Sequence, residues 1–265
     1  MRATPSPQDY WDERLRDHWG PHGVGSLAYG RHYNRWLYRV RRHAFLDVCR
    51  SLEANLGEAR VLDVGCGTGF YLDLWKQQSV ASLAGLDFSA SAIGRLQGEH
   101  PEVELVKADI GEPAPPFAAG RFDVVSAFDV LFHIADDDRY GNALRNINAM
   151  LDRDGLLLYS DNFIRSEAKQ HLNYWKSRTL GRIEDALDKA GFEILERKPV
   201  FVLMGSPVDC ESRLYRRVWD TAMKFVQKSE AFGYALGAGL YPWELMLRRL
   251  LSEGPSTEVA VCRKR

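Results

Sequence analysis

Gly65, Gly67 and Gly69 alternate with other residues in the stretch VLDVGCGTGFY, directly after an apolar run. A glycine-rich turn from a strand into a helix lets a ligand lie against bare backbone, close to the N–H groups of the helix. No lysine follows the last glycine, which argues against a phosphate-binding loop. Asp63 precedes the first glycine by two residues. Its negative charge disfavours a pyrophosphate and suits a cofactor that carries an ammonium group.

Two further carboxylates follow later apolar runs. Asp87 ends the run LAGLD, and Asp109 ends the run LVKAD. In open parallel sheets, ligands bind at the carboxyl ends of the strands, where a carboxylate can accept from both hydroxyls of an unphosphorylated ribose. We assign that role to Asp87, with Phe88 lying against a base. Asp109 is placed to accept from an adenine amino group, with Ile110 supplying its backbone N–H and an apolar face.

The elements that position these residues follow a regular rhythm from residue 59 onward. Short apolar runs alternate with helical segments, and runs that are apolar on both faces indicate parallel strands covered on both sides. The sequence therefore predicts a doubly wound α/β fold. The predicted strands are Arg60–Val64, Ser82–Asp87, Val103–Ala108, Phe122–Ala127, Gly155–Ser160, Phe192–Leu203 and Thr257–Cys262. The predicted helices include Phe70–Gln77, Ser91–Gly98, Arg139–Leu151, Leu180–Ala190 and Glu211–Lys228.

The same rhythm divides the chain into three parts. Residues 1–58 form a helical N-terminal cap, because apolar residues recur in its second half at helical spacing. Residues 59–204 together with 256–265 form the ligand-binding α/β domain, and residues 205–255 form a helical insertion that acts as a cap or lid before the last strand. Within this insertion, residues 231–243 carry no charge. That composition fits a lid over an apolar substrate, a dimer contact or contact with a lipid surface.

Composition limits the classes of partner. The chain has 265 residues, of which 45% are hydrophobic, and a formal net charge of −1. It holds no long basic run, which argues against a nucleic-acid partner. The four cysteines are widely scattered and no pair has metal-ligand spacing, which predicts a reducing, cytoplasmic location. No segment reaches the roughly 18 apolar residues of a membrane span, so stable membrane insertion is not expected.

In order, the motifs VLDVGCGTGFY, GLDFS, ADI and FDVVSAFDVLFHI resemble the class I S-adenosylmethionine-dependent methyltransferase superfamily. The resemblance covers residues 59–203 and is specific for the fold and the cofactor, but not for the substrate. It implies a seven-stranded, Rossmann-like sheet with helical N-terminal and C-terminal caps. It also implies the positions that hold S-adenosylmethionine: Gly65 and Gly67 around the methionine part, Asp87 at the ribose, Asp109 and Ile110 at the adenine, and the backbone of Phe128 at the methionine amino group.

Each of these carboxylates also has a structural interpretation. Asp87 could cap the helix that starts near Ser89, and Asp109 could be a simple turn residue. The ordered set of motifs favours ligand binding for Asp87. Asp63 could contact the cofactor or could tie the glycine loop together by hydrogen bonds, and these two interpretations stay open.

The methionine carboxylate needs a cation, and the glycine loop has none. In related small-molecule methyltransferases a preceding helix lends an Arg and aromatic residues. Arg41 is the best candidate here, with Tyr33 among the aromatic residues upstream of it. Arg39 and Arg42 compete for this role, and an exposed helix face is the alternative for any one of them.

Methyl transfer needs an aligned acceptor, exclusion of water and, for a protonated acceptor, a base. His133 follows the fourth predicted strand, and a neutral imidazole can accept a proton near pH 7. Packing beside the cofactor without proton transfer is the equal alternative. Asp129 is the second catalytic candidate, or it caps the helix that follows.

The fifth predicted strand ends in YSDNF. We expect Asp161 and Asn162 to line the substrate mouth, with Tyr174 and Arg178 reaching the same cleft or lying on the surface. Together with Asp129, the Asp161–Asn162 pair resembles the metal ligands of catechol-type O-methyltransferases. We treat metal dependence as the minority interpretation and assign no metal ligand.

The sequence thus predicts methyl transfer from S-adenosylmethionine to a small, fairly apolar metabolite, through an O, N or C nucleophile and in secondary metabolism. One alternative is a divalent-metal catechol-type O-methyltransferase. The others are a protein or peptide methyltransferase and a non-catalytic S-adenosylmethionine-binding module. A homodimer is compatible with the uncharged segment 231–243.

Overall fold

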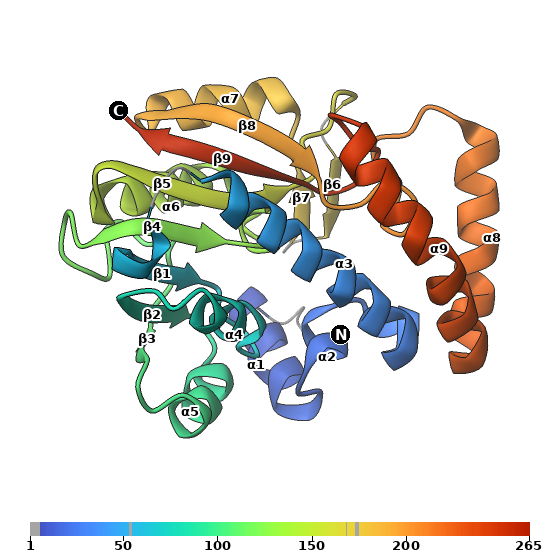
Figure 1. The fold of residues 1–265 in the computed structure, drawn as a ribbon, viewed down its shortest axis with the longest axis horizontal. Coiled ribbons are helices and arrows are strands. Elements are labelled where there is room, and N and C mark those ends of the chain that lie inside the picture. Colours follow the sequence, from blue (N-terminus) through green and yellow to red (C-terminus); the bar gives the residue numbers. More distant parts are fainter. Residues whose placement is uncertain (1–5, 53–54, 168, 173–174) are drawn as a thin grey trace.

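A mixed sheet of seven strands forms the centre of the protein (Figure 1). The computed structural model describes residues 6–52, 55–167, 169–172 and 175–265. The strands lie in the order β3-β2-β1-β4-β5-β9-β8; β1 to β5 pair in parallel, and β9 runs antiparallel to both of its neighbours. Their bounds are β1 Arg60–Val64, β2 Ser82–Asp87, β3 Glu104–Lys107, β4 Phe122–Ala127, β5 Leu151–Asp161, β8 Phe192–Pro199 and β9 Glu258–Lys264. This is the doubly wound, seven-stranded α/β sheet that the sequence predicts.

Helices cover both faces of the sheet. Successive residues of a strand point to opposite faces, so Leu62 packs into the core on one face and Val61 into the core on the other. Helices α6 and α7 cover the first face, and α3 and α4 cover the second. The bounds are α3 Gly30–Ser51, α4 Phe70–Gln77, α5 Ala90–Glu99, α6 Asp137–Met150 and α7 Leu180–Lys189. With both faces covered, a ligand can reach the parallel strands only at their ends.

Two short helices at the N-terminus lie at the carboxyl end of β1 and β2. They are α1 Pro7–Asp17 and α2 Pro21–Val24. The hydroxyl of Ser6 accepts from the N–H of Asp9 and Pro7 takes the first helical position, so the start of α1 is well specified. Helix α1 packs against α5, and α2 packs against α3 (Figure 1).

The C-terminal insertion forms two helices, α8 Arg213–Lys228 and α9 Glu230–Leu250. The uncharged segment 231–243 is part of α9, although glycine lowers helix propensity. Tertiary packing explains the difference, because a Cβ at Gly237 would lie 2.3 Å from Cδ1 of Trp36 in α3. The glycine therefore lets α9 approach α3 closely (Figure 1). In the described part of the chain, no helix is both long and apolar enough to span a membrane.

The last predicted strand before this insertion is shorter than expected, because it ends at Pro199 and not at Leu203. Glu244 of α9 is buried, and its carboxylate accepts from the backbone N–H groups of residues 202–204 at 2.5 to 2.8 Å. These hydrogen bonds hold the backbone after β8 against α9. A hairpin that the sequence pattern does not predict adds β6 Lys169–Leu172 and β7 Trp175–Ser177.

Candidate functional site

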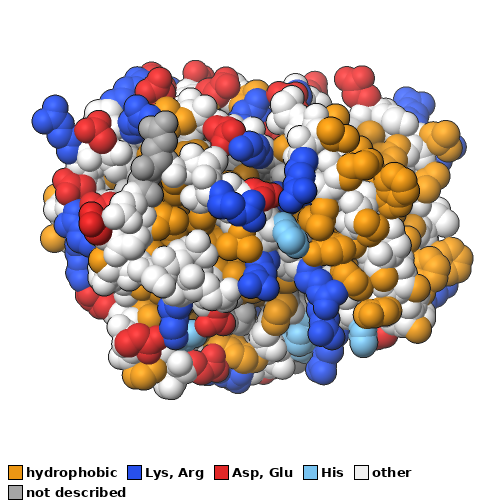
Figure 2. Space-filling model, in the orientation of Figure 1, with side chains coloured by type: hydrophobic (Ala, Val, Ile, Leu, Met, Phe, Trp, Pro, Cys, Tyr) orange, Lys and Arg blue, Asp and Glu red, His pale blue; other side chains and the backbone are white. Residues whose placement is uncertain are grey.

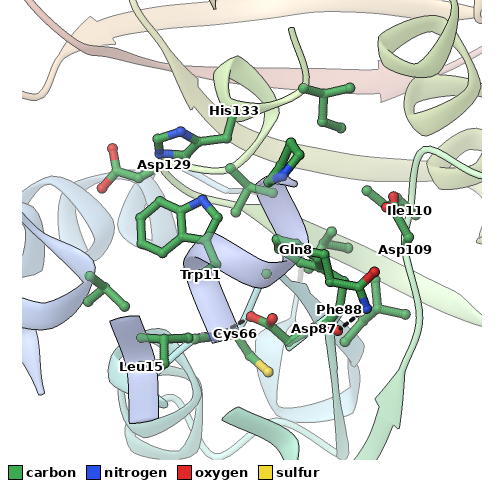
Figure 3. Close-up of a pocket in the computed structure, with 18 of the residues that line it drawn as sticks. Gln8, Trp11, Leu15, Cys66, Asp87, Phe88, Asp109, Ile110, Asp129 and His133 are labelled. Carbon is green, nitrogen blue, oxygen red and sulfur yellow. Dashed lines mark hydrogen bonds between the residues drawn. The ribbon is translucent and has the colours of Figure 1, made fainter. Parts of the chain in front are cut away.

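A cavity of about 510 Å³ lies at the carboxyl ends of β1, β2 and β4. Strand ends and the loops after them form one side, and α1 lies across the other (Figure 3). Most of the predicted site residues come together here. Those that line the cavity are Gly65, Gly67, Asp87, Phe88, Asp109, Ile110, Phe128, Asp129 and His133.

The glycine loop adopts a backbone conformation that other residues rarely reach. The φ angle is 68° at Gly65 and 53° at Gly67, in the left-handed region. A Cβ at Gly65 would lie 2.3 Å from Cγ2 of Val130, and one at Gly67 would lie 3.2 Å from Cγ1 of Val24. The N–H of Gly65 donates to the carbonyl of Leu86 at 2.6 Å, which ties the loop to β2. The loop therefore presents bare backbone to the cavity.

Asp87 faces the cavity from the end of β2 (Figure 3). Its Oδ2 accepts from the N–H of Gly67 and its Oδ1 from the N–H of Ser89, both at 2.8 Å. Burial raises the pKa of Asp87 to about 6, although these N–H groups act in the opposite direction. Each carboxylate oxygen can accept more than one hydrogen bond. Asp87 thus keeps acceptor capacity for hydroxyl groups of a ligand.

Asp109 lies just beyond β3 and already has two partners. Its Oδ1 accepts from the N–H of Gly111 at 2.8 Å, and its Oδ2 accepts from Nη2 of Arg139 at 2.6 Å. Burial lowers the pKa of Arg139. The carboxylates of Asp109 and Glu112 raise it by more, so the net change is upward. Asp109 is therefore a turn residue and an ion-pair partner at the cavity wall, and its contact with adenine stays a prediction.

Helix α1 is fastened to the chain directly after β2. Asp12 accepts through Oδ1 from the hydroxyl of Ser89 at 2.8 Å and from the N–H of Ser91 at 2.9 Å. The backbone hydrogen bond from Ser91 is the largest cause of the lowered pKa of Asp12. Gln8 donates through Nε2 to the carbonyl of Phe88 at 3.3 Å. These bonds hold α1 over the cavity as a lid.

His133 lies on the cavity wall, close to the lid helix α1. It ends the short helix η3 Leu131–His133 after β4, and its ring lies 5.0 Å from the indole of Trp11, edge to face (Figure 3). The ring of Phe132 lies 4.5 Å away. Both predicted roles of His133, as a proton acceptor and as a packing residue, fit this position.

Asp129 follows β4 in a strained conformation, with a φ angle of 59°. Its Oδ2 accepts from Nε of Arg41 at 2.5 Å, and its N–H donates to Oγ of Ser160 at 2.7 Å. Burial lowers the pKa of Arg41, but the Asp129 carboxylate raises it, and the net change is upward. The ion pair fixes the backbone beside Phe128. Because its carboxylate is engaged, Asp129 is better placed to position this backbone than to accept a proton.

Three of the predicted cofactor residues, Arg41, Asp63 and Tyr33, do not line the cavity. Arg41 stacks behind Tyr38, with its guanidinium 5.0 Å from the ring centroid. Asp63 is buried under the loop, where Oδ1 accepts from the hydroxyl of Ser126 at 2.6 Å and burial raises its pKa to about 7. The hydroxyl of Tyr33 donates to a backbone carbonyl at 2.9 Å. Their roles in cofactor binding stay predictions.

Three of the predicted substrate residues, Asp161, Asn162 and Arg178, do not line this cavity either. Asp161, Asn162 and Arg178 are buried, and Arg178 donates through Nη2 to the carbonyl of Ile134 at 2.8 Å. Tyr174 lies outside the described residues. Within the described ranges, no three His, Cys, Asp or Glu side chains are grouped closely enough to hold a metal ion. The substrate roles of these residues stay predictions.

Several cavity residues carry no functional signal in the sequence. Aromatic residues of α3 and α4 line the cavity at positions that also fit a helix core, so spacing alone does not separate the two roles. The Ser-Pro start of α1 is a helix signal and could have located the lid. The cavity residues outside the predicted set include Gln8, Val24, Tyr38, Phe70, Tyr71 and Arg139.

Known proteins share this fold and these motifs. Residues 36–197 match the protein family described as methyltransferase domain. A probable S-adenosylmethionine-dependent methyltransferase of Mycobacterium tuberculosis is 31% identical over 123 residues, which are 46% of this chain and 42% of that protein. A ubiquinone biosynthesis O-methyltransferase of Bradyrhizobium diazoefficiens is 33% identical over 122 residues, which are 42% of this chain and 46% of that protein.

A likeness to solved structures extends over the whole fold. Magnesium protoporphyrin IX methyltransferase from Synechocystis PCC 6803, solved with bound S-adenosylmethionine, has a TM-score of 0.59 at 14% identity, and the match covers 100% of both chains. Fold and family match place the chain in the class I S-adenosylmethionine-dependent methyltransferase superfamily. The chain belongs to the methyltransferase-domain family. It spans less than half the length of the two curated relatives named above.

The residues at the cavity fit S-adenosylmethionine. Asp87 is a buried carboxylate with acceptor capacity toward the cavity, which suits the ribose hydroxyls. The backbone at Gly65 and Gly67 would hold the methionine part, because a side chain is excluded there. Phe88 and Ile110 would offer apolar surface to the adenine. When bound, this cofactor supplies a methyl group on a sulfonium centre.

Proposed function

We propose that this protein transfers a methyl group from S-adenosylmethionine to a small, fairly apolar metabolite that reacts through O, N or C, in cytoplasmic secondary metabolism. The observation that carries the proposal is the cavity of about 510 Å³ under the α1 lid. Tyr38, Phe70, Tyr71 and Phe128 give it aromatic walls, and the last two rings stack at 4.5 Å. A covered site with aromatic walls suits a small acceptor and limits the access of water.

The chain's own residues would align the acceptor and take up its proton. His133 lies on the cavity wall, and an imidazole can accept a proton from an O or N nucleophile near neutral pH. Trp11 would hold the His133 ring in place from the lid side. Asp129 and Arg41 would keep the backbone after β4 fixed beside the cofactor.

Other classes of acceptor, such as tRNA and peptides, are tested alongside small metabolites. Relatives of this chain include a tRNA U34 carboxymethyltransferase of Shewanella sediminis, 37% identical over 84 residues, which are 29% of this chain and 24% of that protein. Against a nucleic-acid acceptor stand the net charge of −1 and the size of the covered cavity. A protein or peptide terminus, a metal-dependent catechol-type reaction and binding without transfer are the further alternatives.

The test is a turnover assay with S-adenosylmethionine and panels of metabolites, peptides and tRNA, with release of S-adenosylhomocysteine as the readout. The proposal expects turnover with at least one small metabolite, unchanged after removal of divalent metal by a chelator. Turnover with tRNA or peptides alone would contradict it. Loss of turnover with the chelator would favour the catechol-type alternative.

A homodimer and a cap made by residues 205–255 also stay proposals. Leu214, Val218 and Phe225 are exposed on one side of α8, which supports a protein contact there. Sedimentation velocity of the wild type and of a Leu214→Glu/Val218→Glu variant would separate a dimer, which the variant disrupts, from a monomer.

A further inference from the structure

A second concave site lies on the outer side of α3, with a volume of about 570 Å³. Arg31, Arg35, Arg39 and Arg42 line it at helical spacing, so one face of α3 carries all four guanidinium groups. Figure 2 shows Lys and Arg side chains gathered in a band over this part of the molecule. We call this site the arginine groove.

The positive charge of the arginine groove is offset in part, because the Glu230 carboxylate interacts electrostatically with Arg31. Among the described residues, no carboxylate forms an ion pair with any of the four guanidinium groups. Arg39 instead lies 4.3 Å from the ring centroid of Trp36, and Arg42 donates to the amide oxygen of Gln77 at 3.0 Å. The carboxylate of Glu230 accepts from the backbone N–H of Arg31 at the start of α3, not from its side chain.

Like charges three and four residues apart on a helix destabilise it. This cost favours an anion that bridges neighbouring guanidinium groups. His22 in the same groove reflects the positive field: burial lowers its pKa, and Arg31, His18 and Arg14 lower it further, against a small opposing effect of Glu230. Guanidinium groups bind phosphate by paired, charge-assisted hydrogen bonds, which suits an anion of that shape.

The arginine groove adjoins the cavity under the lid. Tyr38 and Phe70 line both sites, and their rings meet edge to face with centroids 4.7 Å apart. Phe70 begins α4 directly after the glycine loop. The two sites therefore share a wall at this aromatic pair, and a ligand in the groove lies directly beside the cavity.

We propose that the arginine groove binds a phosphate group of the acceptor, and that the methyl-accepting end of the same molecule reaches the cavity past Tyr38 and Phe70. This inference rests on the proposed function, because it names the class of acceptor: a soluble phosphate ester with an apolar part. The groove is concave, its four arginines lie on one face of α3, and Trp19 forms part of its wall. This shape suits a single phosphate-bearing molecule better than an extended polynucleotide, which needs a longer basic track.

Binding of inorganic pyrophosphate, followed by calorimetry on the full chain, tests the groove directly. We expect an Arg35→Gln/Arg39→Gln variant to bind pyrophosphate at least about tenfold more weakly than the wild type, because hydrogen bonds to charged groups are lost. The matched control is Arg216→Gln/Arg217→Gln, which removes the same charge from exposed positions of α8. Equal weakening in both variants, or none in the first, would overturn the proposal.

Two further measurements separate this inference from the proposed function. All variants should bind S-adenosylhomocysteine like the wild type, which shows that they are folded; failure of the wild type to bind it would contradict the proposed function and not the groove. In the turnover assay, phosphate esters are paired with their free alcohols. We expect the ester to be the better acceptor, and its kcat/KM to fall at least about tenfold in the groove variant only. Equal turnover of ester and alcohol, or displacement of pyrophosphate by a short RNA at lower concentration than by the esters, would overturn the assignment of the acceptor.

Discussion

Asp87 and Asp161 end parallel strands at the same edge of the sheet, yet their surroundings differ. Asp87 lines the cavity, and each of its oxygens accepts a backbone N–H. Asp161 is completely buried; Oδ1 accepts from the N–H of Asn162 at 2.7 Å, and Oδ2 has no hydrogen-bond partner within the described part of the chain. Burial raises both pKa values, to about 6 for Asp87 and about 7 for Asp161.

The segments after each strand explain the difference. After β2, the glycine loop and the start of α5 supply N–H donors, and α1 covers the carboxylate without filling the space beside it. After β5, the chain closes over Asp161, with Arg178 buried nearby as a source of positive charge. A carboxylate at a strand end is therefore a candidate for ligand binding, and the following loops decide whether a ligand has room.

The largest expected effect is on Asp87. Asp87→Ala should weaken the binding of S-adenosylhomocysteine by about 100-fold, because two hydrogen bonds to a charged group at roughly 1.5 kcal/mol each are lost. Isothermal titration calorimetry measures this change. Asp161→Ala is the matched control and should keep the affinity within about twofold, since Asp161 lines no described cavity. Equal losses in both variants would break the comparison between the two strand ends.

Asp161 should instead affect stability, in a way that depends on pH. Asp161→Asn should raise the free energy of unfolding at pH 8 by about 1–2 kcal/mol, because it removes a buried charge with one unpaired oxygen. The pKa of Asp161 is near 3.8 in the unfolded chain and about 7 in the folded protein. Between these values the folded state binds more protons, so this residue's contribution to stability falls as pH rises.

Urea unfolding between pH 4 and pH 8 measures that difference. The gap between Asp161→Asn and the wild type should be small at pH 4 and should widen toward pH 8. A gap that does not change with pH would mean that ionisation of Asp161 is not the cause.

Replacing a glycine by alanine should change the free energy of unfolding in opposite directions at Gly67 and Gly239. Gly67→Ala should lower the free energy of unfolding by about 1 kcal/mol or more, because its φ of 53° is unfavourable for alanine. Gly239→Ala lies on the exposed side of α9, where an added Cβ meets nothing within 4 Å. It should raise stability by up to about 1 kcal/mol, since alanine favours helix. Thermal unfolding of both variants gives the signs, and stabilisation by Gly67→Ala would contradict the account of the loop.

The smallest expected effect concerns the lid. Trp11→Ala should weaken S-adenosylhomocysteine binding about threefold, mainly through faster dissociation, because Trp11 lines the cavity from α1. Stopped-flow displacement measures the dissociation rate. Trp243→Ala is the control, because Trp243 is 58% exposed on α9. An unchanged rate in Trp11→Ala would show that α1 does not retain the ligand.

The sheet and its motif positions could be predicted from the sequence because they follow local rules. Alternation and apolar runs specify the strands, and the glycine loop and Asp87 stand at fixed places relative to them. The order of the motifs along the chain was enough to bring most of the predicted site residues to one cavity, although many other residues also line it. The comparisons with known proteins confirm the family and the cofactor class.

The place where α1 docks and the burial of Asp161 could not be predicted, because both depend on packing between distant segments. Helix α1 has a polar, charged sequence that does not show where it packs. Its position over the cavity follows from the contacts with Ser89 and Ser91 in the structure. Asp161 reads like Asp87 in the sequence, since both follow apolar runs. Gly237 is expected from the sequence to disfavour a helix. The structure shows instead that it allows close packing against Trp36.

A crystal structure of the protein with S-adenosylhomocysteine tests the central claim most directly. The account predicts the ligand in the cavity under α1, with both ribose hydroxyls within hydrogen-bond distance of the Asp87 carboxylate and the amino-acid part against the backbone at Gly65 and Gly67. Ribose hydroxyls that bind elsewhere, or a ligand outside this cavity, would contradict it.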